Sequence, residues 1–171
     1  MITLQLAKTH CKVDEDDDDI LIGGYIKAAV AYCEGYTGRV MSSRDKTFEF
    51  KCFGDCLDIG LRPLEAVTTI LYTAPDGQEQ TLDPTKFRLV GDKIYPALGE
   101  AFPAIAYPSL VMATVTLGEE DEEPLEVMTQ AALLLISHWY ENREAVVVGT
   151  ISSNIPFAVT SLLDLHRQDL A

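Results

Sequence analysis

Apolar residues recur at helical spacing towards both ends of this chain and alternate with polar residues in its middle. Between residues 20 and 38, two adjacent apolar rows follow three-and-four spacing, which is typical of a helix with a broad buried face. Gly38 stands where a left-handed residue would end that helix. A shorter helix is predicted over Leu4 to Cys11, with Thr3 as its cap. The two rows are Leu21, Tyr25, Ala28, Tyr32 and Tyr36, and beside them Ile22, Ile26, Ala29 and Cys33.

The pattern becomes strand-like between about residues 45 and 118. Thr47 to Phe53 alternates, with Phe48, Phe50 and Cys52 on one side, which predicts a strand. Cys56 to Ile59 is expected to pair with it after a turn. Two glycine-containing dipeptides predict hairpins further along. The first is Asp76-Gly77, between the strand patterns Val67 to Tyr72 and Gln80 to Leu82. The second is Gly91-Asp92, between Phe87 to Val90 and Lys93 to Tyr95. A last strand is predicted over Val111 to Leu117.

Helical spacing returns after Pro124, a residue that suits the first turn of a helix. A further helix is predicted over Phe157 to Leu170. This order of elements predicts an α+β fold, in which a mainly α-helical bundle carries an inserted block of short antiparallel β-strands. We expect one domain over residues 1–171, with helices at about 3–38 and 124–170 and the β-insertion at about 45–118. The expected buried stripe of the third helix is Leu125, Met128, Ala131, Ala132, Leu135, Ile136 and Trp139.

Composition supports a folded chain and argues against nucleic-acid binding. Hydrophobic residues make up 47% of the chain, which is too many for a disordered protein. The formal net charge of -14 lacks the clustered Lys and Arg that grip phosphates. Two acidic runs, at residues 14–19 and 119–123, directly precede helix patterns. Negative charge is favourable at a helix N-terminus, so we interpret both runs as solvated helix starts.

The sequence contains no apolar window long enough for a transmembrane helix. Its first residues lack the basic and apolar regions of a secretory signal. We therefore expect the chain to fold in a cytoplasm, with its four cysteines as thiols.

Candidate chemical sites fail on spacing. A calcium loop starting at Asp14 needs Gly and Glu where Asp19 and Tyr25 stand. Cys52 and Cys56 form one loose pair, which favours buried thiols over structural zinc. His10, His138 and His166 are isolated from any recognisable nucleophile motif. We expect no catalytic residue, no cofactor and no metal.

The segment from Ala131 to Thr150 indicates assembly instead. A long apolar helix pattern meets an aromatic pair, then a charged cluster, then a short apolar run. An uncovered apolar run needs either the core of its own subunit or a partner. Both alternatives are open, and Arg143 could form a local surface ion pair or one between subunits. The candidate interface residues are Trp139, Tyr140, Glu141, Arg143, Glu144, Val146, Val147, Val148, Phe157, Leu162 and Leu163.

The chain opens with a short helix pattern, an acidic turn and a helix pattern ending in Tyr36-Thr37-Gly38-Arg39. In this it resembles a known family, the head–tail connector (adaptor) proteins of tailed phages, which are also described as DNA-packaging proteins. Leu82-Asp83-Pro84 and Phe87-Arg88-Leu89 resemble the β-insertion of longer members. Residues 138–149 are the most similar part, and Pro156 to Val159 leading to Leu162-Leu163 resembles the end.

This resemblance implies a non-enzymatic virion part. Such proteins form a ring, typically twelve-fold, beneath the portal protein, where the ring extends the DNA channel and docks a tail or stopper protein. The implied partners are therefore copies of the chain itself, the portal, the tail and DNA that passes without specific binding, with no membrane. The implied location is the host cytoplasm during assembly and then the virion neck. Two alternatives stay open, namely a tail-completion or neck protein that contacts the tail, and a soluble prophage-encoded binding protein outside the virion.

Overall fold

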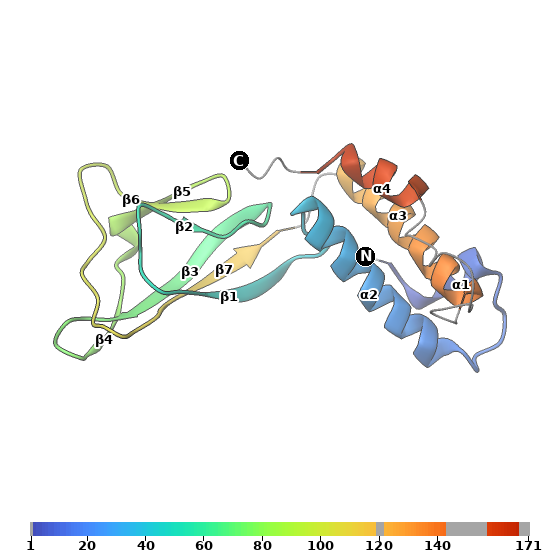
Figure 1. Cartoon of the computed structure of the whole chain (residues 1–171), viewed down its shortest axis with the longest axis horizontal. Coiled ribbons are helices and arrows are strands. Elements are labelled where there is room, and N and C mark those ends of the chain that lie inside the picture. Colours follow the sequence, from blue (N-terminus) through green and yellow to red (C-terminus); the bar gives the residue numbers. More distant parts are fainter. Residues whose placement is uncertain (1, 119–121, 143–156, 168–171) are drawn as a thin grey trace, which may run out of the picture. The chain divides into compact units, whose positions relative to one another are not determined.

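The computed structural model describes residues 2–118, 122–142 and 157–167 (Figure 1). The chain divides into two compact units. The helical unit combines residues 1–41 with 120–171, and the sheet unit comprises residues 42–119. The predicted α+β class with an inserted antiparallel block is confirmed. The fold is mixed and not mainly helical, since the inserted strands form a compact unit with two sheets of their own.

The helical unit is built around its third helix. Its elements are α1 (Leu4–Cys11), α2 (Asp19–Thr37), α3 (Glu122–Glu141) and α4 (Phe157–Asp164). Helix α3 packs against each of the other three (Figure 1). Its expected stripe is confirmed at its centre, where the fully buried side chains are Met128, Ala131, Ala132, Leu135 and Ile136. They meet Ile22, Ala29 and Cys33 of α2 and Val159 and Leu163 of α4 in one core cluster.

Local sequence explains where these helices begin and end. The Oγ1 atom of Thr3 accepts a hydrogen bond from the backbone N–H of Leu6 at 3.2 Å, so this residue caps α1 as predicted. Gly38 ends α2 in the left-handed region at φ 71°, as predicted. Helix α3 begins two residues before Pro124, which therefore lies in the first turn, where a missing N–H costs no helical hydrogen bond. No helix in the described parts of the chain is long and apolar enough to cross a membrane.

The sheet unit contains two antiparallel sheets. The four-stranded sheet has the order β1-β7-β3-β4, and the three-stranded sheet has the order β2-β6-β5 (Figure 1). Both predicted hairpins are confirmed, as β3 with β4 and β5 with β6. The strands are β1 (Arg44–Phe50), β2 (Leu57–Asp58), β3 (Leu64–Thr73), β4 (Glu79–Thr81), β5 (Phe87–Val90), β6 (Lys93–Pro96) and β7 (Val111–Leu117), with a 3-10 turn at Pro84–Lys86.

Two predictions about the start of this unit are wrong. Strand β1 ends at Phe50, and the bend that follows leaves Cys52 exposed while Phe53 turns inward. The Phe53 ring stacks on Phe102 at 4.6 Å between centroids, which accounts for the inward turn. The segment after Gly54 pairs through Leu57 with Ile94 of β6 and not with β1.

The last helix is shorter than predicted. Helix α4 ends at Asp164, and the chain turns at Leu165. Its buried residues are Val159 and Leu163, four positions apart, whereas Phe157 and Leu165 are 85% and 71% exposed.

The expected thiols have very different surroundings. All four cysteines are free; Cys33 is buried and Cys52 is exposed. Burial and the nearby Glu34 charge raise the pKa of Cys33 to about 12. Because the thiolate is the reactive form, the Cys33 thiol should react slowly for two reasons: it is buried, and it stays protonated at neutral pH.

The first prediction is that a thiol-alkylating reagent at pH 8 modifies Cys52 rapidly in the native protein and modifies Cys33 only after denaturant is added. Peptide mass spectrometry after timed labelling measures both rates. Rapid native labelling of Cys33 would contradict the packing of α2 against α3.

The second prediction compares two leucines of the C-terminal segment. Leu163→Ala removes a fully buried side chain and should lower the free energy of unfolding by about 2–5 kcal/mol. Leu165→Ala, at a 71% exposed position, should change it by less than about 0.5 kcal/mol. Urea unfolding followed by helical circular dichroism measures both, and equal effects would show that α4 is not docked as described.

Candidate functional site

Two aromatic residues of the predicted interface fix the C-terminal end of α3 inside the helical unit. The Trp139 ring lies 6.1 Å from the Tyr25 ring, centroid to centroid, with a tilt of 52°. The Tyr140 hydroxyl donates to Oδ2 of Asp18 at 2.7 Å. Both aromatic residues are half-buried, whereas Glu141 is exposed at the helix end. Part of the surface of Trp139 and Tyr140 is therefore buried within their own subunit, whereas the charge of Glu141 faces solvent.

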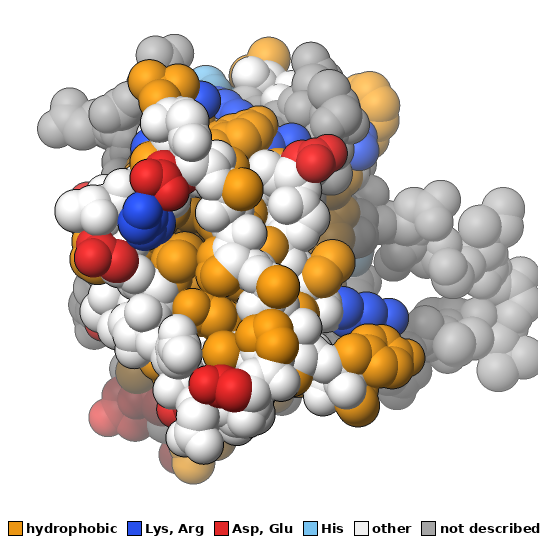
Figure 2. All heavy atoms as spheres, turned by 90° about the vertical axis from the view of Figure 1, so that its left-hand side faces the viewer, with side chains coloured by type: hydrophobic (Ala, Val, Ile, Leu, Met, Phe, Trp, Pro, Cys, Tyr) orange, Lys and Arg blue, Asp and Glu red, His pale blue; other side chains and the backbone are white. Residues whose placement is uncertain are grey.

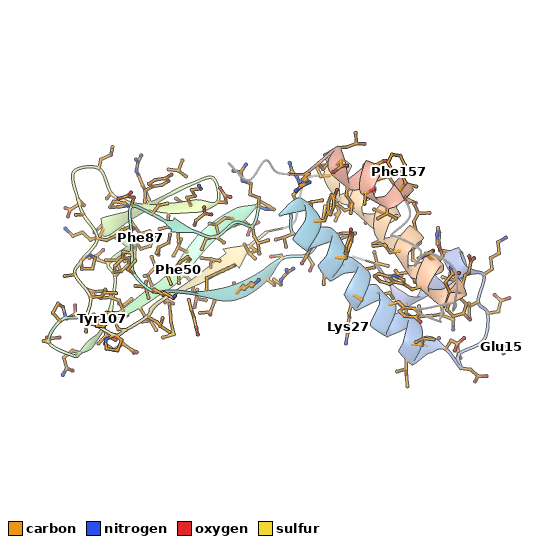
Figure 3. All side chains as sticks on the ribbon, viewed as in Figure 1. Glu15, Lys27, Phe50, Phe87, Tyr107 and Phe157 are labelled. Carbon is orange, nitrogen blue, oxygen red and sulfur yellow. The ribbon has the colours of Figure 1, made fainter. Side chains whose placement is uncertain are left out.

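The acidic run before α2 is organised by a buried lysine. The Lys8 ammonium lies 2.6 Å from Oδ1 of Asp16 and 2.7 Å from Oδ1 of Asp19, and its side chain is only 6% exposed. Asp18 stands at the helix cap but makes no side-chain capping bond, and its Oδ2 atom accepts a hydrogen bond from the Tyr140 hydroxyl. The expectation of a helix start is confirmed. The acidic run is only partly exposed to solvent. Asp18 and Asp19 are half-buried, whereas the exposed Glu15 side chain points away from the helices (Figure 3).

These contacts shift two ionisation equilibria. The hydrogen bonds to Asp16 and Asp19 raise the pKa of Lys8 above its usual 10.5. The hydrogen bond from Lys8 lowers the pKa of Asp16 below its usual 3.8. Both shifts favour the charged forms of Lys8 and Asp16. The salt bridge is therefore charged at every pH between the pKa of Asp16 and the pKa of Lys8.

Helix α4 carries the apolar part of the candidate surface. Phe157 is 85% exposed and lies on the outer side of the helix (Figure 3). Leu162 is half-buried and borders an open groove of about 510 Å³ between α3 and α4. Leu163 is fully buried and offers no surface to a neighbour. The other groove residues are Leu125, Glu126, Val127, Thr129 and Gln130.

The end of α4 is fixed to the end of α2 by polar contacts. The Tyr36 hydroxyl donates to Oδ1 of Asp164 at 2.7 Å. The guanidinium Nε of Arg39 donates to the carbonyl oxygen of His166 at 2.7 Å. Arg167 lies over the Tyr36 ring, 5.2 Å from its centroid. These contacts hold α4 and its groove in a defined position on the helical unit.

Five of the predicted interface residues lie outside the described residues. They are Arg143, Glu144, Val146, Val147 and Val148. Conversely, the sequence analysis missed Lys8, the partnership of Asp18 with Tyr140, and the α3–α4 groove. A lysine at helical spacing on a short amphipathic helix was a readable signal, whereas the groove arises only from tertiary packing.

Within residues 2–118, 122–142 and 157–167, no group of three or more His, Cys, Asp or Glu is arranged to hold a metal ion. The Nδ1 atom of His138 lies 3.4 Å from Nδ2 of Asn142, one turn later in the chain. This histidine thus interacts with the end of its own helix.

Comparisons with known proteins agree with the resemblance found in the sequence. Residues 1–52 match the family model described as phage gp6-like head-tail connector protein, which confirms the resemblance over that part of the chain. A search of the curated proteins gives no significant match.

Solved structures share the whole fold. One similar chain comes from the neck of an empty gene transfer agent (GTA) particle, computed with C6 symmetry, at 24% identity and a TM-score of 0.79, covering 99% of this chain and 91% of that one. Another, from the virion of a native GTA particle, has 24% identity and a TM-score of 0.77 with the same coverage. A third, from a native GTA neck with C12 symmetry, has 24% identity, a TM-score of 0.70, and covers 100% of this chain and 94% of that one. The likeness therefore includes both the helical unit and the sheet unit.

The third prediction concerns the Lys8 corner. The depressed pKa of Asp16 gives stability that is present above about pH 3.8 and is lost as pH falls through its lower folded-state pKa. The raised pKa of Lys8 gives stability that is present below about pH 10.5 and is lost as pH rises through its higher folded-state pKa. Lys8→Met should therefore lower the thermal midpoint at neutral pH, and its difference from wild type should shrink beyond either limit.

Thermal unfolding followed by circular dichroism across this pH range measures the effect. Lys27→Met, at an exposed lysine of α2, is the matched control and should leave the midpoint nearly unchanged. A pH-independent difference for Lys8→Met would mean that its aliphatic packing, and not its charge, matters.

Proposed function

We propose that this chain is a non-enzymatic structural protein of a phage or prophage virion. In this proposal it forms a ring-shaped head–tail connector beneath the portal, extends the DNA channel and docks the tail. One observation carries the proposal, which is that the connector-family match at the N-terminus coincides with a full-length fold likeness to chains from particle necks. The proposed location is the host cytoplasm during assembly and the virion neck afterwards.

The negative charge of the chain supports a channel that DNA passes through and does not support a site that binds DNA. At -14, each subunit repels phosphate, and a ring multiplies that charge. Clustered basic residues would hold DNA, which a channel must release. The two units are proposed to act as one connector domain in the ring.

A closed ring requires a contact in which one surface of a subunit meets a different surface of the next. We propose that the outer side of α4 supplies one of these surfaces, since Phe157 is 85% exposed there beside the α3–α4 groove. Glu141 and Arg143 would set orientation more than affinity. The valine run 146–148 and Glu144 remain interface candidates on sequence grounds alone.

The function is tested with particles from a strain that lacks this gene. Without the protein, heads should either keep their DNA or lose it, and should remain separate from tails. Adding the purified protein should restore joined particles. Electron microscopy counts the joined fraction. Normal particles without the gene would reject the connector role.

The fourth prediction concerns the α4 surface. Phe157→Asp should leave the fold intact, because the side chain is 85% exposed, and should reduce binding of the protein to portal-bearing heads about ten-fold or more. Co-sedimentation with heads measures binding. Ile20→Asp, at a 94% exposed position on the first turn of α2, is the matched control and should bind normally. Normal binding by Phe157→Asp would remove α4 from the interface.

A further inference from the structure

The sheet unit has a long loop that hydrogen bonds and a ring stack attach to the rest of the unit. This tip loop, residues 97–110, connects β6 to β7. Its backbone is fixed at both sides, since Ala97 N–H donates to the Lys86 carbonyl at 2.9 Å and Ala106 N–H donates to the Thr73 carbonyl at 2.8 Å. Between these points the Phe102 ring stacks on Phe53, with centroids 4.6 Å apart. The loop is thus a preorganised surface.

This ordered loop nevertheless exposes large apolar side chains. Tyr107 is 99% exposed, Leu98 is 84% exposed and Leu110 is 47% exposed. Glu100 is the sole charged residue of the loop, and its carboxylate lies 2.9 Å from the Lys86 ammonium. A preorganised, nearly uncharged loop with exposed aromatic and aliphatic side chains is typical of a protein-binding surface.

The loop lies at the free end of the sheet. The chain enters and leaves the unit near Arg44 and Leu117, which face each other across β1 and β7. The tip loop joins the opposite end of β7, where Val111 lies across from Phe50 and Tyr72. Figure 2 looks onto this end and shows hydrophobic side chains gathered down its middle, with few charged ones among them. The chain connections therefore leave this surface uncovered within the sheet unit.

We propose that the tip loop is the docking site for an apolar surface on a different protein, one that joins after the ring is in place. This inference rests on the proposed function. There, α4 of the helical unit supplies one surface of the ring contact. The free end of the sheet unit is then available for the contact with the tail side.

The size of the surface favours a partner that meets many subunits at once. The exposed apolar side chains of the loop offer on the order of 500 Å², compared with about 800 Å² per partner in a stable one-to-one complex. A single tip is therefore too small to hold a partner alone. A ring presents the same tip on every subunit, and simultaneous weak contacts combine into tight binding.

The chemistry of the loop disfavours other occupants. It has no Lys or Arg for DNA. A second copy would have to offer this loop a complementary apolar surface from its own sheet unit. Among the described residues of the sheet unit, Val90 is the other strongly exposed large hydrophobic side chain, and one valine does not form a complementary surface.

The fifth prediction tests the tip loop with the double variant Leu98→Ser/Tyr107→Ser in the full chain. It should fold normally, since both side chains are strongly exposed, and should decorate purified heads that lack the protein as well as wild type does. When free tails are then added, the fraction of joined particles should fall at least about ten-fold, because exposed aromatic anchors dominate such contacts. Co-sedimentation measures decoration, and electron microscopy counts joining.

Val90→Ser, at a 49% exposed position outside the loop, is the matched control and should join tails normally. Normal joining by the double variant would overturn the inference. Loss of head decoration by a folded double variant would overturn it as well, because the tip would then contact a neighbouring copy or the portal. If the wild-type protein itself fails to restore joining, the connector function fails, which is a distinguishable result.

Discussion

Burial of the apolar stripe of α3 is the interaction on which the helical unit depends. Helices α1 and α2 come from the start of the chain and α4 from its end, and all three pack on α3. Each large aliphatic side chain buried there contributes about 1.5–3 kcal/mol. The strands of residues 42–119 interrupt this unit in sequence, yet α2 and α3 still meet through Cys33 and Met128, which belong to one buried cluster. The sheet unit is thus an insertion that leaves the helical packing complete.

Polar contacts at the rim of this core decide which charges remain available. Lys8 neutralises part of the acidic run, and Tyr140 occupies the carboxylate of Asp18. Asp14, Glu15 and Asp17 stay exposed in the same run. The acidic surface is consequently held in place by a buried cation, so a subunit can carry strong negative charge without loosening the start of α2. That combination fits the proposed role, in which DNA passes without being bound.

The sequence predicted the elements well and their partners less well. Helical spacing, Gly38 and the two hairpin dipeptides act over a few residues, so α2, β3–β4 and β5–β6 followed from local rules. The pairing of Leu57 with Ile94 joins segments far apart in the chain, and alternation alone cannot choose between partners. The prediction that Cys52 is buried was wrong because the bend after Phe50 exchanges the inward-facing and outward-facing positions. The exposure of Phe157 and Tyr107 was equally beyond local pattern, since only the packed fold shows which apolar residues are left outside.

The distribution of exposed apolar residues gives the two units different capacities. On the helical unit, Phe157 stands beside a groove lined by both apolar and polar residues, including Glu126 and Gln130. Such a mixed surface can fix orientation as well as bury area, which a repeated contact between identical subunits requires. On the sheet unit, most of the exposed apolar residues belong to a loop that hydrogen bonds and a ring stack attach to the rest of the unit, which lowers the ordering entropy lost on binding. A surface that is small and preorganised becomes effective only when many copies act together, so in the proposed ring its strength would depend on the number of subunits present. The proposal thereby implies an order of assembly, because a subunit outside the ring would offer its later partner too little surface to bind.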